Sequence, residues 1–207
     1  MQAGPPSIRT LWRVLLGSAP IMEALLISIG IVALAEIGDK TQLLTLVLAA
    51  RYRKPWPIVA GIFVATLINH GVAGALGAWL TSVIGPSAMR WVLGISFLAM
   101  AAWMLIPDKL DDDTGESKRI GGVFLSTAVL FFFVEMGDKT QVATVALAAR
   151  FDSLVAVVLG TTIGMMLANA PVAFFGEALA KRLPVRIVHR VAAAVFAVLG
   201  VGVLVSG

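Results

Sequence analysis

Long stretches of apolar residues run through this chain and are separated by short polar breaks. A helix needs roughly 20 apolar residues to cross the hydrocarbon core of a bilayer. Breaks such as 51–55, Gly85-Pro86 and Pro107 end successive stretches. The pattern predicts six membrane-spanning helices, at about residues 22–49, 57–80, 89–106, 121–149, 154–180 and 187–206.

The composition supports an all-α integral membrane protein. Hydrophobic residues make up 59% of the chain and charged residues 14%, with a mean hydropathy of +0.95, which lies outside the usual range of a soluble domain. The net charge of +4 does not indicate nucleic-acid binding, because the basic residues lie in short connections beside apolar spans. The absence of cysteine excludes disulfides and thiolate metal sites, which leaves oxygen and nitrogen ligands.

The chain consists of two halves that repeat each other at an offset of 99 residues. Residues 36–52 align with residues 135–151 and are identical at 11 of 17 positions. The register continues without a gap, because Gly61 falls on Gly160 further along. Each half therefore contains one copy of a three-helix unit.

An odd number of crossings per copy turns the second copy upside down, as in many secondary transporters. We therefore predict two inverted three-helix repeats joined by a polar linker. The expected organisation is an interfacial segment at 1–20, a first repeat at 21–107, an acidic cytoplasmic linker at 108–120 and a second repeat at 121–207.

The distribution of basic residues predicts the orientation in the membrane. Ten Lys and Arg residues lie in the first, third and fifth connections, against four on the opposite side. Because cytoplasmic connections carry the excess of positive charge, both termini should lie outside and the linker in the cytoplasm.

Two identical clusters of charge lie inside apolar spans. A charged residue at the centre of a membrane helix costs at least ~2.5–3.5 kcal/mol on insertion scales, so it persists where it is paired or where function requires it. On a continuous helix the Glu, Asp, Lys and Gln of each cluster would lie along one face, with Thr pointing away. The predicted metal ligands are Glu36, Asp39, Gln42, Glu135, Asp138 and Gln141, flanked by Lys40, Thr41, Lys139 and Thr140.

Two such faces at the repeat axis would offer enough oxygen ligands for a hard divalent cation. Gly38 and Gly137 weaken the helix between the acids, which could open the backbone or allow close approach of another helix. The four acids and two lysines carry a net charge of −2, which one divalent cation or two protons would neutralise. We therefore hypothesise exchange of one divalent cation for about two protons.

Structural explanations compete with this hypothesis. Glu36–Lys40 and Glu135–Lys139 have the spacing of ordinary helix salt bridges. Asn69, His70 and Asn169 lie in the spans after each cluster, where they could complete the site or relay protons, although hydrogen bonding between helices is the commoner reason for such residues. The sequence also favours an interfacial place for Glu177, beside Lys181, and a solvated loop for residues 111–113.

The two clusters resemble the duplicated E-x-G-D-[KR]-[ST] signature of the Golgi-type calcium/manganese:proton exchanger family. The resemblance extends to the architecture of three helices, an acidic linker and three helices. It implies export of Mn²⁺ or Ca²⁺ in exchange for protons, carried by Glu36, Asp39, Glu135 and Asp138. For a chain of bacterial size without a recognisable targeting segment, it favours manganese efflux across the plasma membrane, the bacterial inner membrane.

Three other functions remain open at this point. An exporter of small organic solutes such as amino acids would share the architecture, and a passive cation channel would share the charged motifs. An intramembrane aspartyl protease needs one Asp per helix without a neighbouring Lys, which does not fit these motifs. No resident cofactor is expected besides the transported ion, and a homodimer is an option because six helices offer little bulk to enclose a site.

Overall fold

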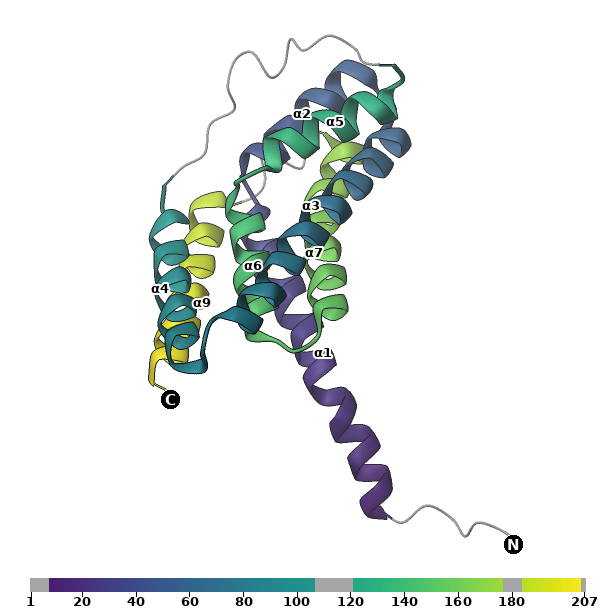
Figure 1. Ribbon diagram of the computed structural model, residues 1–207. Helices are drawn as coiled ribbons and strands as arrows, with labels where there is room; N and C mark the ends of the chain where they lie inside the picture. The colour runs from purple at the N-terminus through teal and green to yellow at the C-terminus, as the bar shows by residue number, and fades with distance from the viewer. Residues whose placement is uncertain (1–7, 107–120, 177–183, 206–207) are drawn as a thin grey trace, which may run out of the picture.

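The computed structural model describes residues 8–106, 121–176 and 184–205, and their regular structure is entirely α-helical (Figure 1). The acidic linker at 108–120, Glu177 and Lys181 lie outside the described residues. The helices are α1 (Ile8–Glu36), α2 (Lys40–Tyr52), α3 (Pro55–Val83), α4 (Pro86–Trp103), α5 (Val123–Glu135), α6 (Lys139–Arg150), α7 (Leu154–Phe175) and α9 (Val185–Val205).

The first and fourth predicted spans are each broken in the middle of the charged cluster. α1 ends at Glu36 and α2 begins at Lys40, and the part of α1 from Pro20 meets α2 at a bend of 68°. The cause is local, because Gly38 and Gly137 adopt φ values of +84° and +76°, which a right-handed helix cannot contain. The prediction of continuous helices over 22–49 and 121–149 is therefore wrong, and the alternative that glycine opens the backbone is confirmed.

Several helices meet the requirements of a membrane span. α3, α7 and α9 are long and apolar enough to cross a bilayer, and Pro20–Glu36 together with α2 forms a bent fourth candidate. Large apolar side chains point outwards on the described surface, among them Trp56 at 73% and Phe175 at 71% exposure. This much exposed apolar surface is typical of a protein surrounded by lipid. α1 begins at Ile8, earlier than the predicted start of the first span at 22.

Corresponding helices of the two halves run in opposite directions. In Figure 1, α1 ascends while α5 descends, and α3 descends while α7 ascends. The halves also pack crosswise, α1 against α7 and α5 against α3. Small residues permit these contacts, since a Cβ at Gly61 would lie 2.8 Å from Cβ of Thr127 and one at Gly160 would lie 2.8 Å from Cβ of Ser28. Both pairs are related by the offset of 99, so the repeat is visible in the packing.

The interior contains two apolar clusters. One joins α1, α4, α6, α7 and α9, and its largest side chains include Phe97 and Phe196. The other joins mainly α2, α3, α5 and α7 around Phe131 and Ile62. Both helix breaks adjoin these clusters, so the charged residues are held among tightly packed helices.

Candidate cation site at the two helix breaks

Each break places the end of one helix and the start of the next in the interior of the fold. Glu36 is the last residue of α1, and Asp39 precedes α2 in an extended conformation with φ −77° and ψ 167°. Asp138 repeats this geometry before α6, with φ −80° and ψ 167°. Neither aspartate side chain caps its helix. The C-terminal end of a helix carries partial negative charge, so a glutamate placed there favours a nearby cation.

The lysines of the two motifs pair across the halves. Lys139 Nζ lies 3.4 Å from Asp39 Oδ1, and Lys40 Nζ lies 3.3 Å from Asp138 Oδ1. The first pair is fully enclosed, with both side chains 1% exposed, whereas Lys40 is 27% exposed. These contacts tie one half to the other, which the helix spacing within a single motif does not predict. Each lysine neutralises the aspartate of the opposite motif.

The glutamates are held by polar residues of α3 and α7. Asn169 Nδ2 donates to Glu36 Oε1 at 3.1 Å, and Thr45 Oγ1 donates to Asn169 Oδ1 at 2.7 Å. Around Glu135, Asn69 Nδ2 donates to Oε2 at 3.3 Å and His70 Nε2 lies 2.8 Å from Oε1. All three predicted accessory residues, Asn69, His70 and Asn169, therefore lie directly on a motif carboxylate.

The two glutamines accept hydrogen bonds from the glycines at the breaks. The Gly38 N–H donates to Gln42 Oε1 at 2.9 Å, and the Gly137 N–H donates to Gln141 Oε1 at 2.6 Å. Gln42 Nε2 also donates to the Ala168 carbonyl at 3.1 Å, which ties α2 to α7. The amide oxygens thus hold the turn in this state, although an amide oxygen has a second lone pair.

The broken helix also changes where the threonines lie. Thr41 and Thr140 are fully buried, and in the described structure their hydroxyl oxygens have no hydrogen-bond partner. On a continuous helix Thr would have pointed away from the charged face. Their burial beside the breaks follows from the change of direction at Asp39 and Asp138.

The structure brings the predicted ligands together only in part. Within the described ranges, no three His, Asp or Glu side chains converge on one point as a ready metal site. Instead, each aspartate contacts a lysine of the other half, and each glutamate contacts the helix that follows the other motif. In this arrangement lysines neutralise the aspartates, and polar side chains hold the glutamates.

Two contributing residues escaped the reading of the sequence. Thr45 contacts Asn169, and Thr66 Oγ1 donates to Glu135 Oε2 at 3.3 Å. A signal for Thr45 was present, because the repeat places Thr144 at the equivalent position. Thr66 lies one turn before Asn69 and His70 on α3, so helical spacing would have included it.

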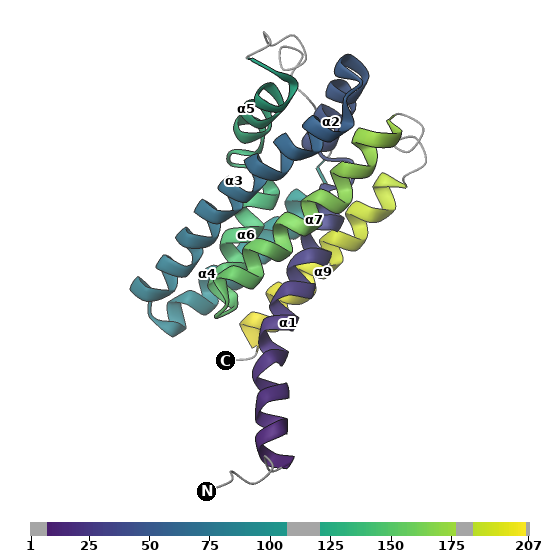
Figure 2. The same ribbon diagram turned by 90° about the vertical axis from the view of Figure 1, so that its right-hand side faces the viewer.

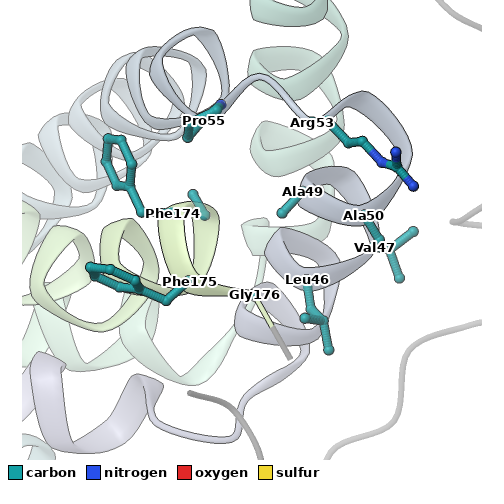
Figure 3. Close-up of a pocket in the computed structure, with 10 residues that line it drawn as sticks. Leu46, Val47, Ala49, Ala50, Arg53, Pro55, Phe174, Phe175 and Gly176 are labelled. Atoms are coloured by element: carbon teal, nitrogen blue, oxygen red, sulfur yellow. The ribbon is translucent and has the colours of Figure 1, made fainter. Parts of the chain in front are cut away.

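A cavity of about 580 Å³ opens beyond the first break, between α2 and the end of α7 (Figure 3). Its lining includes Leu46 and Ala173, which follow Gln42 and Asn169 by one helical turn. Ala49 and Gly176 also line it. The equivalent place in the other half is closed, since a Cβ at Gly77 would lie 2.2 Å from the Val145 carbonyl oxygen. The end of the fold beyond the first break is therefore open, and the equivalent end of the other half is closed.

Comparisons with known proteins identify the family. The family model described as "Divalent cation/proton antiporter GDT1" matches residues 24–112 and 123–207. A Vibrio cholerae protein named "Putative manganese exporter" is 51% identical over 177 residues, covering 85% of this chain and 88% of that protein. "GDT1-like protein 3" of Oryza sativa subsp. japonica is 26% identical, covering 85% of this chain and 71% of the rice protein. No solved structure matches.

The family match spans both halves and includes both helix breaks. Its description accounts for buried carboxylates in a multi-pass membrane protein, and it excludes the alternative of an intramembrane protease. The chain belongs to the GDT1 family of divalent cation/proton antiporters and is a transporter, not an enzyme.

Proposed function

We propose that this protein exports Mn²⁺ from the bacterial cytoplasm in exchange for about two protons. The observation that carries the proposal is the pair of helix breaks, which bury four carboxylates and pair the two aspartates among them with lysines of the opposite halves. The cation preference draws support from the similar Vibrio cholerae protein, whose name refers to manganese. The residues proposed to carry the ion are Glu36, Asp39, Glu135 and Asp138.

The ion pairs between the halves suggest how the protein changes conformation when no cation is bound. Four uncompensated carboxylates would be costly in a medium of low dielectric constant. Lys40 and Lys139 reduce that cost by neutralising the aspartates. A divalent cation would compete with the lysines for the aspartate oxygens, and protons on the carboxylates would neutralise the remaining charge when no cation is bound.

The amide and hydroxyl oxygens complete the proposed ligand set. Gln42 and Gln141 would ligate through the second lone pair of Oε1 while still holding the glycine turn. Thr41 and Thr140 flank the set with buried hydroxyls. An all-oxygen set of this kind suits a hard divalent cation such as Mn²⁺ or Ca²⁺.

We further propose six crossings of the inner membrane as two inverted repeats, with both termini outside and the acidic linker in the cytoplasm. The opposite directions of corresponding helices support this arrangement (Figures 1 and 2). The connection that contains Arg51, Arg53 and Lys54 would then face the cytoplasm. The cavity between α2 and α7 adjoins this connection, so the described state would receive cations from the cytoplasm.

The test is reconstitution of the purified protein into liposomes that contain a pH-sensitive dye, with imposed Mn²⁺ or Ca²⁺ gradients. Wild type is compared with Glu36→Gln and Asp138→Asn. Glu23→Gln is the matched control, because Glu23 is an exposed acid of the same helix α1, away from both breaks. Cation-driven proton movement should be retained in the control and lost in the two site variants.

The comparison of ions identifies the substrate. Faster proton movement with Mn²⁺ than with Ca²⁺ supports the proposed preference. Cation flux in wild type without any opposing proton flux would refute the exchange. A Glu36→Gln variant as active as wild type would refute the assignment of the site.

A further inference from the structure

The pair formed by α4 and α9 sits asymmetrically on the rest of the fold. The two helices are counterparts in the repeat and lie side by side (Figure 1). The rings of Phe97 and Phe196, which are also counterparts, are 6.2 Å apart. α9 packs on α1, and α4 packs on α6. The exchanged contacts, α4 on α5 and α9 on α2, are at most marginal among the described residues. The pair therefore occupies only one of the two positions that the repeat relates, the one in contact with α1 and α6.

In this position α9 covers the first helix break. Val185 lies so close to Gly38 that a Cβ there would come 3.2 Å from the Val185 Cβ. His189 is 8% exposed, and its Nε2 lies 2.7 Å from the Ile37 carbonyl oxygen. Because a carbonyl can only accept, the imidazole donates this bond. It satisfies a backbone carbonyl that the break has removed from the helical pattern.

Among the described residues, the second break has no such cover. Apart from its two chain neighbours, no described residue has an atom within 4 Å of the position that a Cβ on Gly137 would take, and Met136 is 51% exposed. The repeat assigns Pro86 and Arg90 of α4 to the places that Val185 and His189 take on α9. The Arg90 guanidinium instead lies over the Trp91 ring, 5.8 Å from its centroid, and its buried Nε has no hydrogen-bond partner in the described structure.

The far ends of the helices differ in the same way. Gly77 is pressed against Val145, whereas its counterpart Gly176 and the counterpart Leu46 line the open cavity. The contacts of Val185, His189 and Gly77 thus lack equivalents in the other half, as expected of a two-state element that adopts one of two related arrangements. An arginine, like a histidine, donates readily to a carbonyl, so Arg90 is chemically able to replace His189.

We propose that His189 and Arg90 are alternating positioning residues of the exchange cycle. His189 holds the first break in the state described here. In the oppositely facing state the α4–α9 pair shifts onto α5 and α2, His189 releases the Ile37 carbonyl, and Arg90 donates to the Met136 carbonyl. This inference rests on the proposed antiport, because it assigns the two arrangements to the two faces of the membrane.

Disulfide trapping tests the proposal directly, because the natural chain contains no cysteine. The pair Gly38→Cys with Val185→Cys reports the described state, where the two Cβ positions are close to disulfide distance. The pair Pro86→Cys with Gly137→Cys reports the opposite state. The two pairs are matched, since each replaces one glycine at positive φ. Leu98→Cys with Gly200→Cys joins α4 to α9 and is the control that both states should permit.

Oxidation in proteoliposomes should trap both reporter pairs in separate molecules and stop transport reversibly, while the control pair forms without stopping it. His189→Ala should slow the first pair and speed the second, changing the ratio of their rates roughly tenfold, the effect of one hydrogen bond. His189→Gln should restore the ratio, because it keeps a donor. Arg90→Ala should shift the ratio the opposite way.

A merely structural role of His189 would slow the first pair without speeding the second, and that result would overturn the proposal. Failure of the second pair to form in any background would also overturn it. Both cysteine pairs could form and respond reciprocally while Mn²⁺ moves no protons in wild type. In that case the alternation of His189 and Arg90 is supported and the proposed exchange is wrong. The two proposals are therefore tested separately.

Discussion

The surroundings of Glu36 and Glu135 differ although the same motif surrounds both. Glu135 contacts Thr66, Asn69 and His70 of α3. Glu36 contacts Asn169 of α7, which is the counterpart of His70. The counterpart of Asn69 is Ala168, which offers only its backbone carbonyl, to Gln42. The repeat has kept the charged motif identical and has let the helix that faces it diverge.

This difference teaches that the two motifs are not interchangeable in a single state. The first break is covered by α9 and adjoins an open cavity, whereas the second is uncovered by any described helix and lies in the half whose end is closed. Because the two breaks differ in cover and in burial, variants of residues related by the offset of 99 should have unequal effects.

The largest inequality is expected for the lysines. Lys139→Met leaves Asp39 buried next to an apolar side chain, which should lower the free energy of unfolding by about 3–5 kcal/mol. Lys40→Met should cost less, about 2 kcal/mol, because the Lys40 side chain is 27% exposed while its partner Asp138 is buried. Titration from mild detergent into denaturing detergent measures both. Asp39→Asn combined with Lys139→Met should recover much of the loss, and equal costs for the two lysines would contradict the difference in burial.

The glycines of the breaks should differ by a smaller amount. Gly137→Ala should lower the free energy of unfolding by about 1–2 kcal/mol, the cost of the positive φ alone, because its Cβ would contact no neighbouring described residue. Gly38→Ala carries a similar strain and also places Cβ 2.2 Å from Val185 Cγ1, so we expect about 2–4 kcal/mol in total. Thermal unfolding in detergent compares the two variants. Gly38→Ala with Val185→Ala should return to the cost of Gly137→Ala, and a double variant as unstable as Gly38→Ala would show that Val185 is not the cause.

Sequence reasoning identified the helical membrane architecture, the repeat and the charged motifs, because apolar length and residue identity are local properties. It placed Asn69, His70 and Asn169 near the site for the same reason, since they follow each motif at similar spacing. It misplaced the helices across Gly38 and Gly137, because a glycine tolerates both helical and left-handed conformations. The pairing of Lys139 with Asp39 depends on how the halves pack, which the spacing within one motif cannot show.

The smallest expected effect concerns the residues that distinguish the glutamates. His70→Asn gives Glu135 the same neighbour that Glu36 has, so an amide hydrogen bond should replace the 2.8 Å imidazole contact while Thr66 and Asn69 stay in place. We expect the apparent KM for Mn²⁺ to change about three- to tenfold, the range of one hydrogen bond, with little change in kcat. Proton-coupled uptake into proteoliposomes measures both constants. The reciprocal variant Asn169→His, at the counterpart position, is the matched comparison. It should impair transport more, because it also removes the hydrogen bond from Thr45 to Asn169. Equal effects of the two variants would show that the different neighbours of Glu36 and Glu135 do not influence cation binding. The difference between the two halves would then matter only for the proposed movement of α4 and α9.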